Sequence, residues 1–245
     1  VCAYSIDEKD YVEFGLKEED APHASWAKYI FGVCREMIKR GVDVKGFNTA
    51  FAGDVPLGAG MSSSAALEST YAYALNELFN LGIDKFELAR IGQSTEHNYV
   101  GVKCGIMDQF ASVFGKKGHL MRLDCRSMEF EYFPFDPEQH GYKLVLLNSC
   151  VKHELVGSPY NDRRASCERV AKILGQEFLR GATMEQLDAL KDQISEEDYM
   201  RARYVIGEEK RVLDVCDALG KGDYETVGAR MYETRWGMSK DYEVS

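Results

Sequence analysis

Residues 56–68 have the sequence Pro56-Leu57-Gly58-Ala59-Gly60-Met61-Ser62-Ser63-Ser64-Ala65-Ala66-Leu67-Glu68, and this stretch decides the fold. Two glycines two positions apart allow a tight backbone path, and good helix formers fill residues 65–78. The pattern predicts a glycine-rich loop that runs directly into a helix N-terminus. Such a terminus presents unpaired N–H groups and a partial charge of roughly +0.5, which favour the binding of phosphate.

Two well-known phosphate-binding motifs are excluded. No Gly-Lys-Ser/Thr follows the glycines, so the loop is not a Walker A loop, and Gly-x-Gly-x-x-Gly is absent, so it is not a dinucleotide-binding fingerprint. A simple turn before a capped helix is the alternative interpretation, because serine is a preferred N-cap residue. Loop chemistry by itself leaves both interpretations open.

Later stretches of the chain form a longer pattern with this loop. They are Cys104-Gly105-Ile106-Met107-Asp108-Gln109-Phe110, Leu123-Asp124-Cys125-Arg126-Ser127, Asn148-Ser149 with Val151-Lys152-His153, and Asp241-Tyr242-Glu243-Val244-Ser245. The loop resembles the phosphate loop of the galactokinase, homoserine kinase, mevalonate kinase and phosphomevalonate kinase (GHMP kinase) superfamily. The later stretches resemble the galactokinases in particular, in the same order along nearly the whole chain.

The order of the predicted elements indicates an α+β protein in two parts. Strands and helices alternate up to about residue 133, the stretch Pro134-Phe135-Asp136-Pro137 is the best candidate for a junction, and helices dominate after it. Residues 143–148 are the exception, because their apolar run predicts a buried strand.

The resemblance refines this fold class. It implies the two-domain GHMP kinase fold, with an N-terminal domain like domain 2 of ribosomal protein S5 over residues 1–140. A ferredoxin-like, helix-rich C-terminal domain would follow over residues 141–245, with the active site in the cleft between the two domains. We expect both domains to be incomplete.

The resemblance also assigns the nucleotide site. ATP is the implied co-substrate, and its phosphates would contact the loop residues Gly58, Ala59, Gly60, Met61, Ser62, Ser63 and Ser64. Mg²⁺ prefers hard oxygen ligands and usually takes only one or two protein groups. In the family, the last serine of the triplet and a distant glutamate serve, and these match Ser64 and Glu96. The residue types alone would favour an exposed helix carboxylate at Glu96.

Asp108 is the predicted catalytic residue. An acid in the first turn of a helix is stabilised by the helix dipole, by about 0.3–1 kcal/mol, and needs no further role. The resemblance, however, places this carboxylate against the sugar hydroxyl that attacks the γ-phosphate, where it would orient that hydroxyl and accept its proton. Gly105 matches a backbone contact to the sugar, and Tyr160 matches a tyrosine that contacts galactose.

Composition limits the partners and the location of the protein. The chain has 245 residues and a formal net charge of −10, which argues against a nucleic-acid partner. The seven cysteines include no C-x-x-C pair, residues 1–10 lack the apolar core of a signal peptide, and no apolar run is long enough to span a membrane. We expect a cytoplasmic protein that is a monomer or a weak homo-oligomer and has no nucleic-acid or membrane partner.

Two alternatives to a galactokinase remain open at this point. One is an N-acetylgalactosamine kinase of the same superfamily, which would need a pocket for the N-acetyl group. The other is a non-catalytic sensor that binds galactose and ATP. Known sensors of that kind lose small residues just after the loop serines, and Ala65-Ala66 is intact here, which favours an enzyme.

Two family motifs are missing from the chain, and they set the first testable prediction. No Gly-Glu-His-Thr-Asp-Tyr segment and no Gly-Gly-Gly-Phe-Gly-Gly segment occurs, although in the family these bind most sugar hydroxyls and complete the C-terminal domain. We therefore expect the whole protein to phosphorylate galactose and these 245 residues to be inactive by themselves. A coupled ATPase assay with galactose checks this, and family-like turnover by the isolated chain would contradict it.

Overall fold

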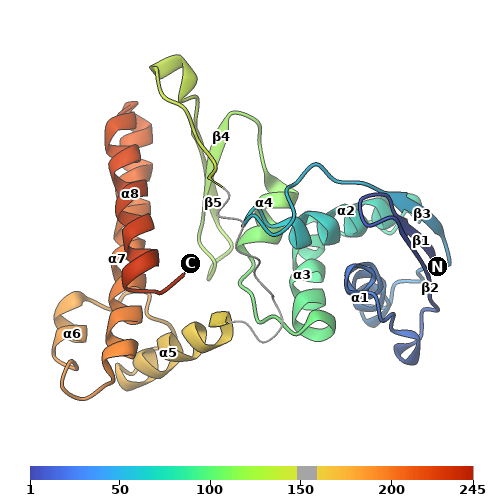
Figure 1. The fold of residues 1–245 in the computed structure, drawn as a ribbon, viewed down its shortest axis with the longest axis horizontal. Coiled ribbons are helices and arrows are strands. Elements are labelled where there is room, and N and C mark those ends of the chain that lie inside the picture. The colour runs from blue at the N-terminus through green and yellow to red at the C-terminus, as the bar shows by residue number, and fades with distance from the viewer. Residues whose placement is uncertain (148–158, 245) are drawn as a thin grey trace. The chain divides into compact units, whose positions relative to one another are not determined.

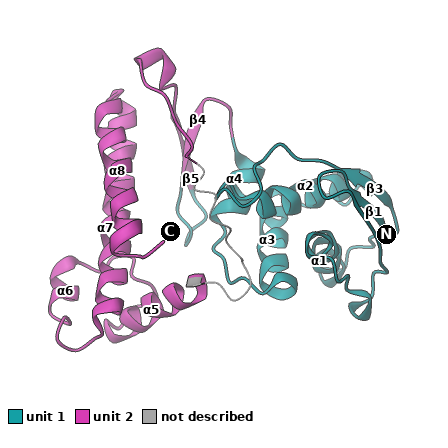
Figure 2. Ribbon diagram, in the orientation of Figure 1, with its two compact units in different colours: residues 1–115, 123–129, 148–156 teal, residues 116–122, 130–147, 157–245 magenta. Residues whose placement is uncertain are grey.

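The computed structural model describes residues 1–147 and 159–244 (Figure 1). The chain forms two compact units (Figure 2). Of the described residues, unit 1 contains 1–115 and 123–129, and unit 2 contains 116–122, 130–147 and 159–244. The chain thus passes between the units more than once, and the domain division predicted at residue 140 stays a prediction.

Unit 1 contains a three-stranded sheet. The strands are β1 (Cys2–Ser5), β2 (Asp10–Glu13) and β3 (Asn48–Phe51), in the spatial order β2-β1-β3. β1 pairs antiparallel with β2 and parallel with β3. The parallel pair requires a long crossover, and the 3₁₀ turn η1 (Glu18–Asp20) and helix α1 (Ser25–Lys39) lie in it.

The other helices of unit 1 follow the phosphate loop. They are α2 (Ser63–Leu78), α3 (Lys85–Thr95), the π-helical turn η2 (Glu96–Val100) and α4 (Met107–Phe114). Asp84 caps α3, because its Oδ1 accepts a hydrogen bond from the Glu87 N–H at 3.0 Å. The helices α2, α3 and α4 all contact one another, so the residues that precede each of them are brought into one region of unit 1.

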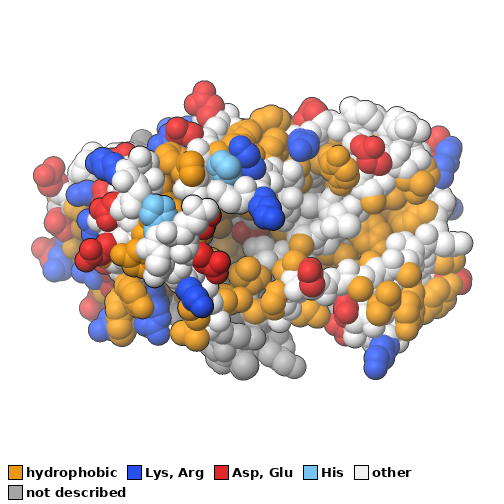
Figure 3. Space-filling model, turned by 90° about the horizontal axis from the view of Figure 1, so that it is seen from above, with side chains coloured by type: hydrophobic (Ala, Val, Ile, Leu, Met, Phe, Trp, Pro, Cys, Tyr) orange, Lys and Arg blue, Asp and Glu red, His pale blue; other side chains and the backbone are white. Residues whose placement is uncertain are grey.

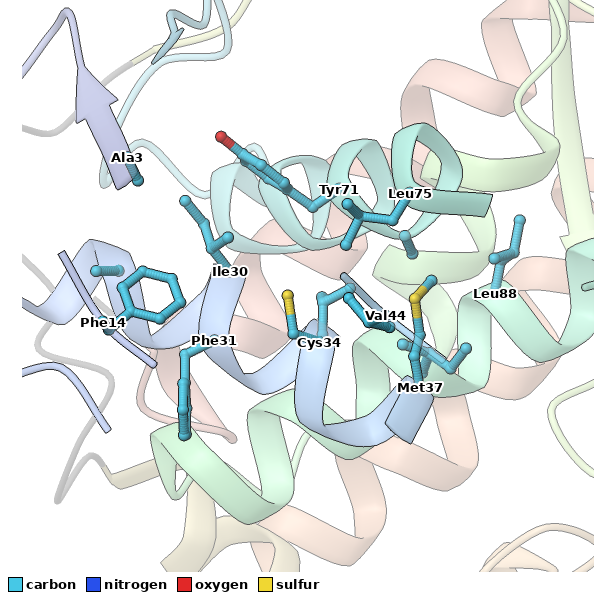
Figure 4. Packing of buried hydrophobic residues seen from close by; sticks show 14 residues of the cluster. Ala3, Phe14, Ile30, Phe31, Cys34, Met37, Val44, Tyr71, Leu75 and Leu88 are labelled. Atoms are coloured by element: carbon cyan, nitrogen blue, oxygen red, sulfur yellow. The ribbon is translucent and has the colours of Figure 1, made fainter. Parts of the chain in front are cut away.

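The core of unit 1 lies between the sheet and α1, α2 and α3. The apolar residues of α1 recur at helical spacing and are buried, among them Ile30, Phe31, Cys34 and Met37, as Figure 4 shows. Phe31 meets the ring of Phe14 edge-on, with ring centroids 5.8 Å apart. This core holds the crossover helix on the sheet and gives α2 a fixed support.

Unit 2 contains a two-stranded sheet and four helices among its described residues. Its elements are β4 (His119–Leu123, whose last residue belongs to unit 1), β5 (Phe130–Pro134), η3 (Glu138–His140), α5 (Pro159–Ile173), α6 (Met184–Asp188), α7 (Glu196–Lys221) and α8 (Tyr224–Lys240). The long helix α7 contacts α5, α6, α8 and β5, so it is the central element of the unit. Val170, Leu187 and Ala202 form the centre of a second apolar core there.

The predicted strand at 143–148 is wrong over its described residues. Residues 143–147 form no strand, and Leu144, Val145, Leu146 and Leu147 are between 55% and 84% exposed. The physical reason is that no described strand pairs with this stretch, so its backbone groups and apolar side chains have no sheet to join. Residue 148 lies outside the described part of the chain.

The surface mixes apolar and charged side chains. On the face drawn in Figure 3, hydrophobic patches are separated by acidic and basic side chains. Within residues 1–147 and 159–244, no helix combines the length and the hydrophobicity that crossing a bilayer requires.

The core of unit 1 gives the second prediction. Phe31 is 1% exposed, and its ring contacts both Phe14 and Tyr99. Replacing it with alanine should lower the free energy of unfolding by about 3–5 kcal/mol, because a large buried ring is lost and a cavity remains. Urea denaturation followed by circular dichroism measures this. Leu78→Ala is the control, because Leu78 is 61% exposed and its loss should change stability by less than about 1 kcal/mol. Equal losses in both variants would contradict the assigned core.

Candidate active site

The glycine-rich loop adopts a backbone that most residues avoid. Gly58 and Gly60 have φ values of 67° and 71°, and Ser62, which precedes α2, has φ 57°. A Cβ added at either glycine would meet no atom within 4 Å, so the strained conformation, and not crowding, requires glycine here. Ser62 lacks this freedom and is held in the left-handed region, which is uncommon outside glycine and typical of functional sites.

The first turn of α2 offers backbone N–H groups to a ligand. The first helical hydrogen bond of α2 runs from the Ala66 N–H to the Ser62 carbonyl at 3.0 Å, so the amides of Ser63, Ser64 and Ala65 precede it. The Ser62 side chain makes no cap hydrogen bond that would occupy them. This observation weakens the interpretation of the serines as a simple helix cap, and it suits an anion.

Ser64 and Glu96 lie together, as the assignment of a shared metal would require. The Ser64 hydroxyl lies close enough to the Glu96 carboxylate to lower its pKa. Glu96 is only 4% exposed, and its Oε2 atom is buried with no hydrogen-bond partner. Burial raises the pKa of Glu96, the nearby Ser64 hydroxyl opposes this rise, and the charge of Asp108 raises the pKa further. Residue type alone favoured an exposed carboxylate at Glu96, and that interpretation is wrong.

A π-helical turn positions Glu96. Glu96 begins η2, where the helix of α3 widens, and such π-turns frequently occur at functional sites. Asn98 in this turn donates a hydrogen bond of 2.9 Å to Glu36 of α1, a buried carboxylate that also accepts hydrogen bonds from Arg40 and Lys39. Burial by itself would raise the pKa of Glu36, but these hydrogen bonds lower it overall. Glu36 therefore remains an ionised carboxylate, and its bond to Asn98 fixes the turn.

Asp108 lies in the first turn of α4, half-buried, in the same unit as the loop. Its charge raises the pKa of Glu96 and of Glu68, so it lies near both carboxyl groups. Through Glu96 it is linked to Ser64 at the end of the loop. The structure therefore brings the loop, the Ser64–Glu96 pair and Asp108 into one region of unit 1.

Glu68 is a buried acid that the sequence analysis did not single out. It follows Ser64 by four residues on α2, so the two side chains share one face of the helix. It is 0% exposed, and burial, together with the charges of Glu96 and Asp108, raises its pKa to about 9. The same surroundings raise the pKa of the Cys104 thiol, through burial first, to about 12. The site therefore accumulates acidic groups whose charges oppose one another.

The loop before α4 is held by side chains from α3 and η2. The Cys104 carbonyl accepts a hydrogen bond from Gln93 Nε2 at 3.3 Å, and His97 Nε2 lies 2.8 Å from the same oxygen. Gly105 follows directly and is exposed. Its backbone thus lies directly before the first turn of α4, and its contact to a sugar stays a prediction.

Comparison with known proteins decides the family. Residues 28–116 match the family described as GHMP kinases N terminal domain. A galactokinase of Thermotoga neapolitana is 44% identical over 220 residues, which cover 90% of this chain and 61% of that protein. A galactokinase of Thermosipho africanus is 39% identical over 244 residues, which cover 100% of this chain and 67% of that protein. The chain belongs to the galactokinase family.

A solved galactokinase confirms the fold. The structure of Lactococcus lactis galactokinase complexed with galactose superposes with a TM-score of 0.88 at 30% identity, over 100% of this chain and 65% of that one. The predicted α+β GHMP kinase fold is therefore confirmed. This galactokinase-family chain spans 61% of the length of the Thermotoga relative, so the activity of the whole protein is a separate question.

Tyr160, the third predicted sugar contact in this galactokinase-family chain, belongs to unit 2. It is the second residue of α5 and is 44% exposed. Its assignment stays a prediction. The motif Asn148-Ser149 with Val151-Lys152-His153 lies outside the described residues, as does Ser245.

The sequence offered one signal for the missed residue Glu68. Its spacing of four from Ser64 places it on the same helix face as a predicted site residue, although helical spacing alone does not reveal burial. No comparable signal pointed to Glu36 and Asn98, because their hydrogen bond joins residues 62 positions apart.

The raised pKa of Glu68 gives the third prediction. In the unfolded chain Glu68 ionises near its ordinary pKa of 4.5, whereas in the folded chain it keeps its proton up to about 9. Between these two pH values, Glu68 is ionised in the unfolded chain and protonated in the folded chain. The free energy of unfolding therefore falls as the pH rises, by at most about 1.4 kcal/mol per pH unit. Glu68→Gln removes this dependence, although Glu96 and Asp108 still face the position.

Urea denaturation at pH 5, 6.5 and 8 tests the prediction that Glu68 is protonated in the folded chain. We expect Glu68→Gln to become more stable than the unmodified chain by about 1–3 kcal/mol at pH 8, and the difference to shrink toward pH 5. Glu77→Gln is the matched control, because Glu77 lies exposed on the same helix. A difference that does not change with pH would rule out a protonated Glu68.

Proposed function

We propose that the whole protein transfers the γ-phosphoryl group of ATP to the C1 hydroxyl of α-D-galactose and forms galactose 1-phosphate. The observation that carries this proposal is the common location of the glycine-rich loop, the Ser64–Glu96 pair and Asp108 in unit 1. Phosphoryl transfer requires a cradle for the polyphosphate, a cation to neutralise charge and an oriented hydroxyl, and these three features match those needs.

The loop from Gly58 to Ser64 supplies the cradle. Its left-handed residues turn the backbone, and the N–H groups at the start of α2 precede the first helical hydrogen bond. These amides and the positive end of the helix dipole would bind the phosphates of ATP. A local site of this kind overcomes the net charge of −10, because charges beyond about 8 Å are largely screened at physiological salt.

Ser64 and Glu96 fit a magnesium ion. They provide a hydroxyl and a carboxylate, both hard oxygen donors, and Glu96 Oε2 is buried with no partner. Within the described residues no group of three or more His, Cys, Asp or Glu side chains forms a metal cluster. This agrees with magnesium, which takes one or two protein ligands, several waters and substrate phosphates. When bound, Mg²⁺ would neutralise charge on the transferred phosphoryl group.

Asp108 would act on the sugar. Its carboxylate accepts the proton of the galactose C1 hydroxyl while that oxygen bonds to the γ-phosphorus and ADP leaves. A positioned general base contributes roughly 10²–10⁴ in rate. The backbone at Gly105 and the ring of Tyr160 would contact the sugar, and the solved relative with bound galactose supports the substrate class.

The remaining assignments follow from the same reasoning. The described cysteines Cys2, Cys34, Cys104, Cys125, Cys167 and Cys216 are all free thiols, which suits the reducing cytoplasm. We propose a cytoplasmic enzyme that acts as a monomer or weak homo-oligomer, with galactose and ATP as its small-molecule substrates.

Asp108→Asn gives the fourth prediction. In the whole protein, the variant should phosphorylate galactose roughly 10²–10⁴-fold more slowly, because asparagine cannot accept the proton, while ATP binding is retained. A coupled assay for ADP release and titration with a fluorescent ATP analogue measure the two quantities. Asp192→Asn, at an exposed position of unit 2, is the control and should change neither.

The outcomes separate the candidate functions. Unchanged turnover in Asp108→Asn would exclude the base role. An unmodified whole protein that binds galactose and ATP without turnover would indicate a sensor. Stronger competition by N-acetylgalactosamine than by galactose would assign the other sugar kinase.

A further inference from the structure

We propose that Glu68 is a positioning residue for the reaction: through its hydrogen bond to Gln109 it fixes the first turn of α4 and so orients the carboxylate of Asp108. This inference rests on the proposed function for its effect on rate. Its structural part, that Glu68 holds α4, can be tested without any activity.

The contact joins the two helices that carry the site. Glu68 lies on α2, one helical turn after Ser64, and Gln109 lies on α4, directly after Asp108. Gln109 Nε2 donates a hydrogen bond to Glu68 Oε2 at 3.2 Å. Glu68 is 0% exposed and Gln109 is 1% exposed, so water does not compete for this bond. A shift of α4 against α2 would break it.

Burial leaves two oxygen atoms of Glu68 and Gln109 without hydrogen bonds. The Oε1 atoms of both Glu68 and Gln109 are buried and have no hydrogen-bond partner among the described residues. Two acceptors facing no donor are costly, but a proton on Glu68 converts one of them into a donor. A protonated Glu68 still accepts from the Gln109 amide through Oε2, and it leaves no unpaired negative charge on the buried carboxyl group.

Close packing by α3 restricts the pair further. A Cβ added at Gly92 would lie 2.9 Å from Gln109 Cγ and 3.5 Å from Glu68 Oε2. The glycine therefore allows α3 to approach, and its backbone closes the space in which the Gln109 side chain could rotate. With Gln109 fixed in this way, the preceding residue on the same helical turn, Asp108, has a fixed backbone from which to reach the substrate.

The charge state of Glu68 also suits the site. Glu96 from η2 and Asp108 from α4 face Glu68, together with Tyr29 of α1 and Cys104. Burial and the two carboxylates raise the pKa of Glu68 to about 9, so at neutral pH it adds no third negative charge to a site that must accept ATP. Its part is to hold a side chain in place, and a misplacement of about 1 Å at a reacting group can cost roughly 10² in rate.

Two substitutions at Glu68 test the proposal in the whole protein. Glu68→Gln keeps an uncharged group that can accept from and donate to Gln109, and its kcat should stay within about threefold of the unmodified enzyme. Glu68→Met keeps the length but makes no hydrogen bond, and its kcat should fall about 10–100-fold, while KM for ATP changes by less than about threefold. A fall in Glu68→Gln as large as in Glu68→Met would overturn the proposal.

A second variant breaks the same bond from the other side. Gln109→Met should reduce kcat at least as much as Glu68→Met, because it removes the shared bond and also the contact of 3.9 Å from Gln109 Nε2 to Cys104 Sγ. The double variant should be no slower than Gln109→Met. Fully additive losses would contradict a shared role. This cycle also decides the proposal if one of the single variants folds poorly.

Hydrogen exchange on the 245-residue chain separates the inference from the proposed function. Glu68→Met should speed amide exchange in residues 107–114 about tenfold or more relative to residues 30–39 of α1, and Glu68→Gln should not. Unchanged protection of α4 in Glu68→Met would overturn the positioning role, even if the whole protein phosphorylates galactose. If residues 107–114 lose protection in Glu68→Met but the unmodified whole protein does not phosphorylate galactose, the structural role of Glu68 is retained and the proposed function is rejected.

Discussion

The repulsion between buried carboxyl groups is the constraint on which the site depends. Glu68 and Glu96 are buried and Asp108 is half-buried, all within one small region of unit 1. Like charges at short range in a low-dielectric environment cannot all be ionised without compensation. The compensation differs at each position: the raised pKa of Glu68 favours its protonated form, the Ser64 hydroxyl lies near Glu96 and lowers its pKa, and Asp108 lies at the positive end of a helix.

The three carboxyl groups come together because the three helices after the loop pack against one another. α2 carries Ser64 and Glu68, α3 leads into the π-turn that carries Glu96, and α4 carries Asp108. None of these helices positions the site alone. The mutual contacts of α2, α3 and α4, supported by the core around α1, convert three separate stretches of sequence into one arrangement. The geometry of the candidate site and the packing of the core therefore depend on the same helices of unit 1.

The sequence analysis could predict strands and helices up to about residue 133 and mainly helices after it, because the causes of such elements are local. The apolar spacing of α1, the Asp84 cap and the alternation in the strands each depend on a few neighbouring residues. Residues 143–147 show the limit, since an apolar run forms a strand only when another strand pairs with it, and none of the described strands does. The Glu36–Asn98 hydrogen bond and the burial of Glu96 depend on long-range packing, so no local pattern could reveal them.

The candidate site was predictable in a different way. Residue types alone favoured an exposed carboxylate at Glu96 and a dipole-stabilised acid at Asp108, and only the resemblance to a family assigned them roles. The structure adds a physical argument for a ligand at the loop. The loop holds Ser62 in a left-handed conformation, and the Ser62 side chain makes no cap hydrogen bond to the first amides of α2. Such a loop costs stability unless a ligand uses it. The buried acids beside it carry the same kind of cost, because Glu68, Glu96 and Asp108 repel one another where little water screens their charges. The strained loop and the repelling carboxyl groups lie in one region of unit 1, so the packing of α2, α3 and α4 must offset both costs.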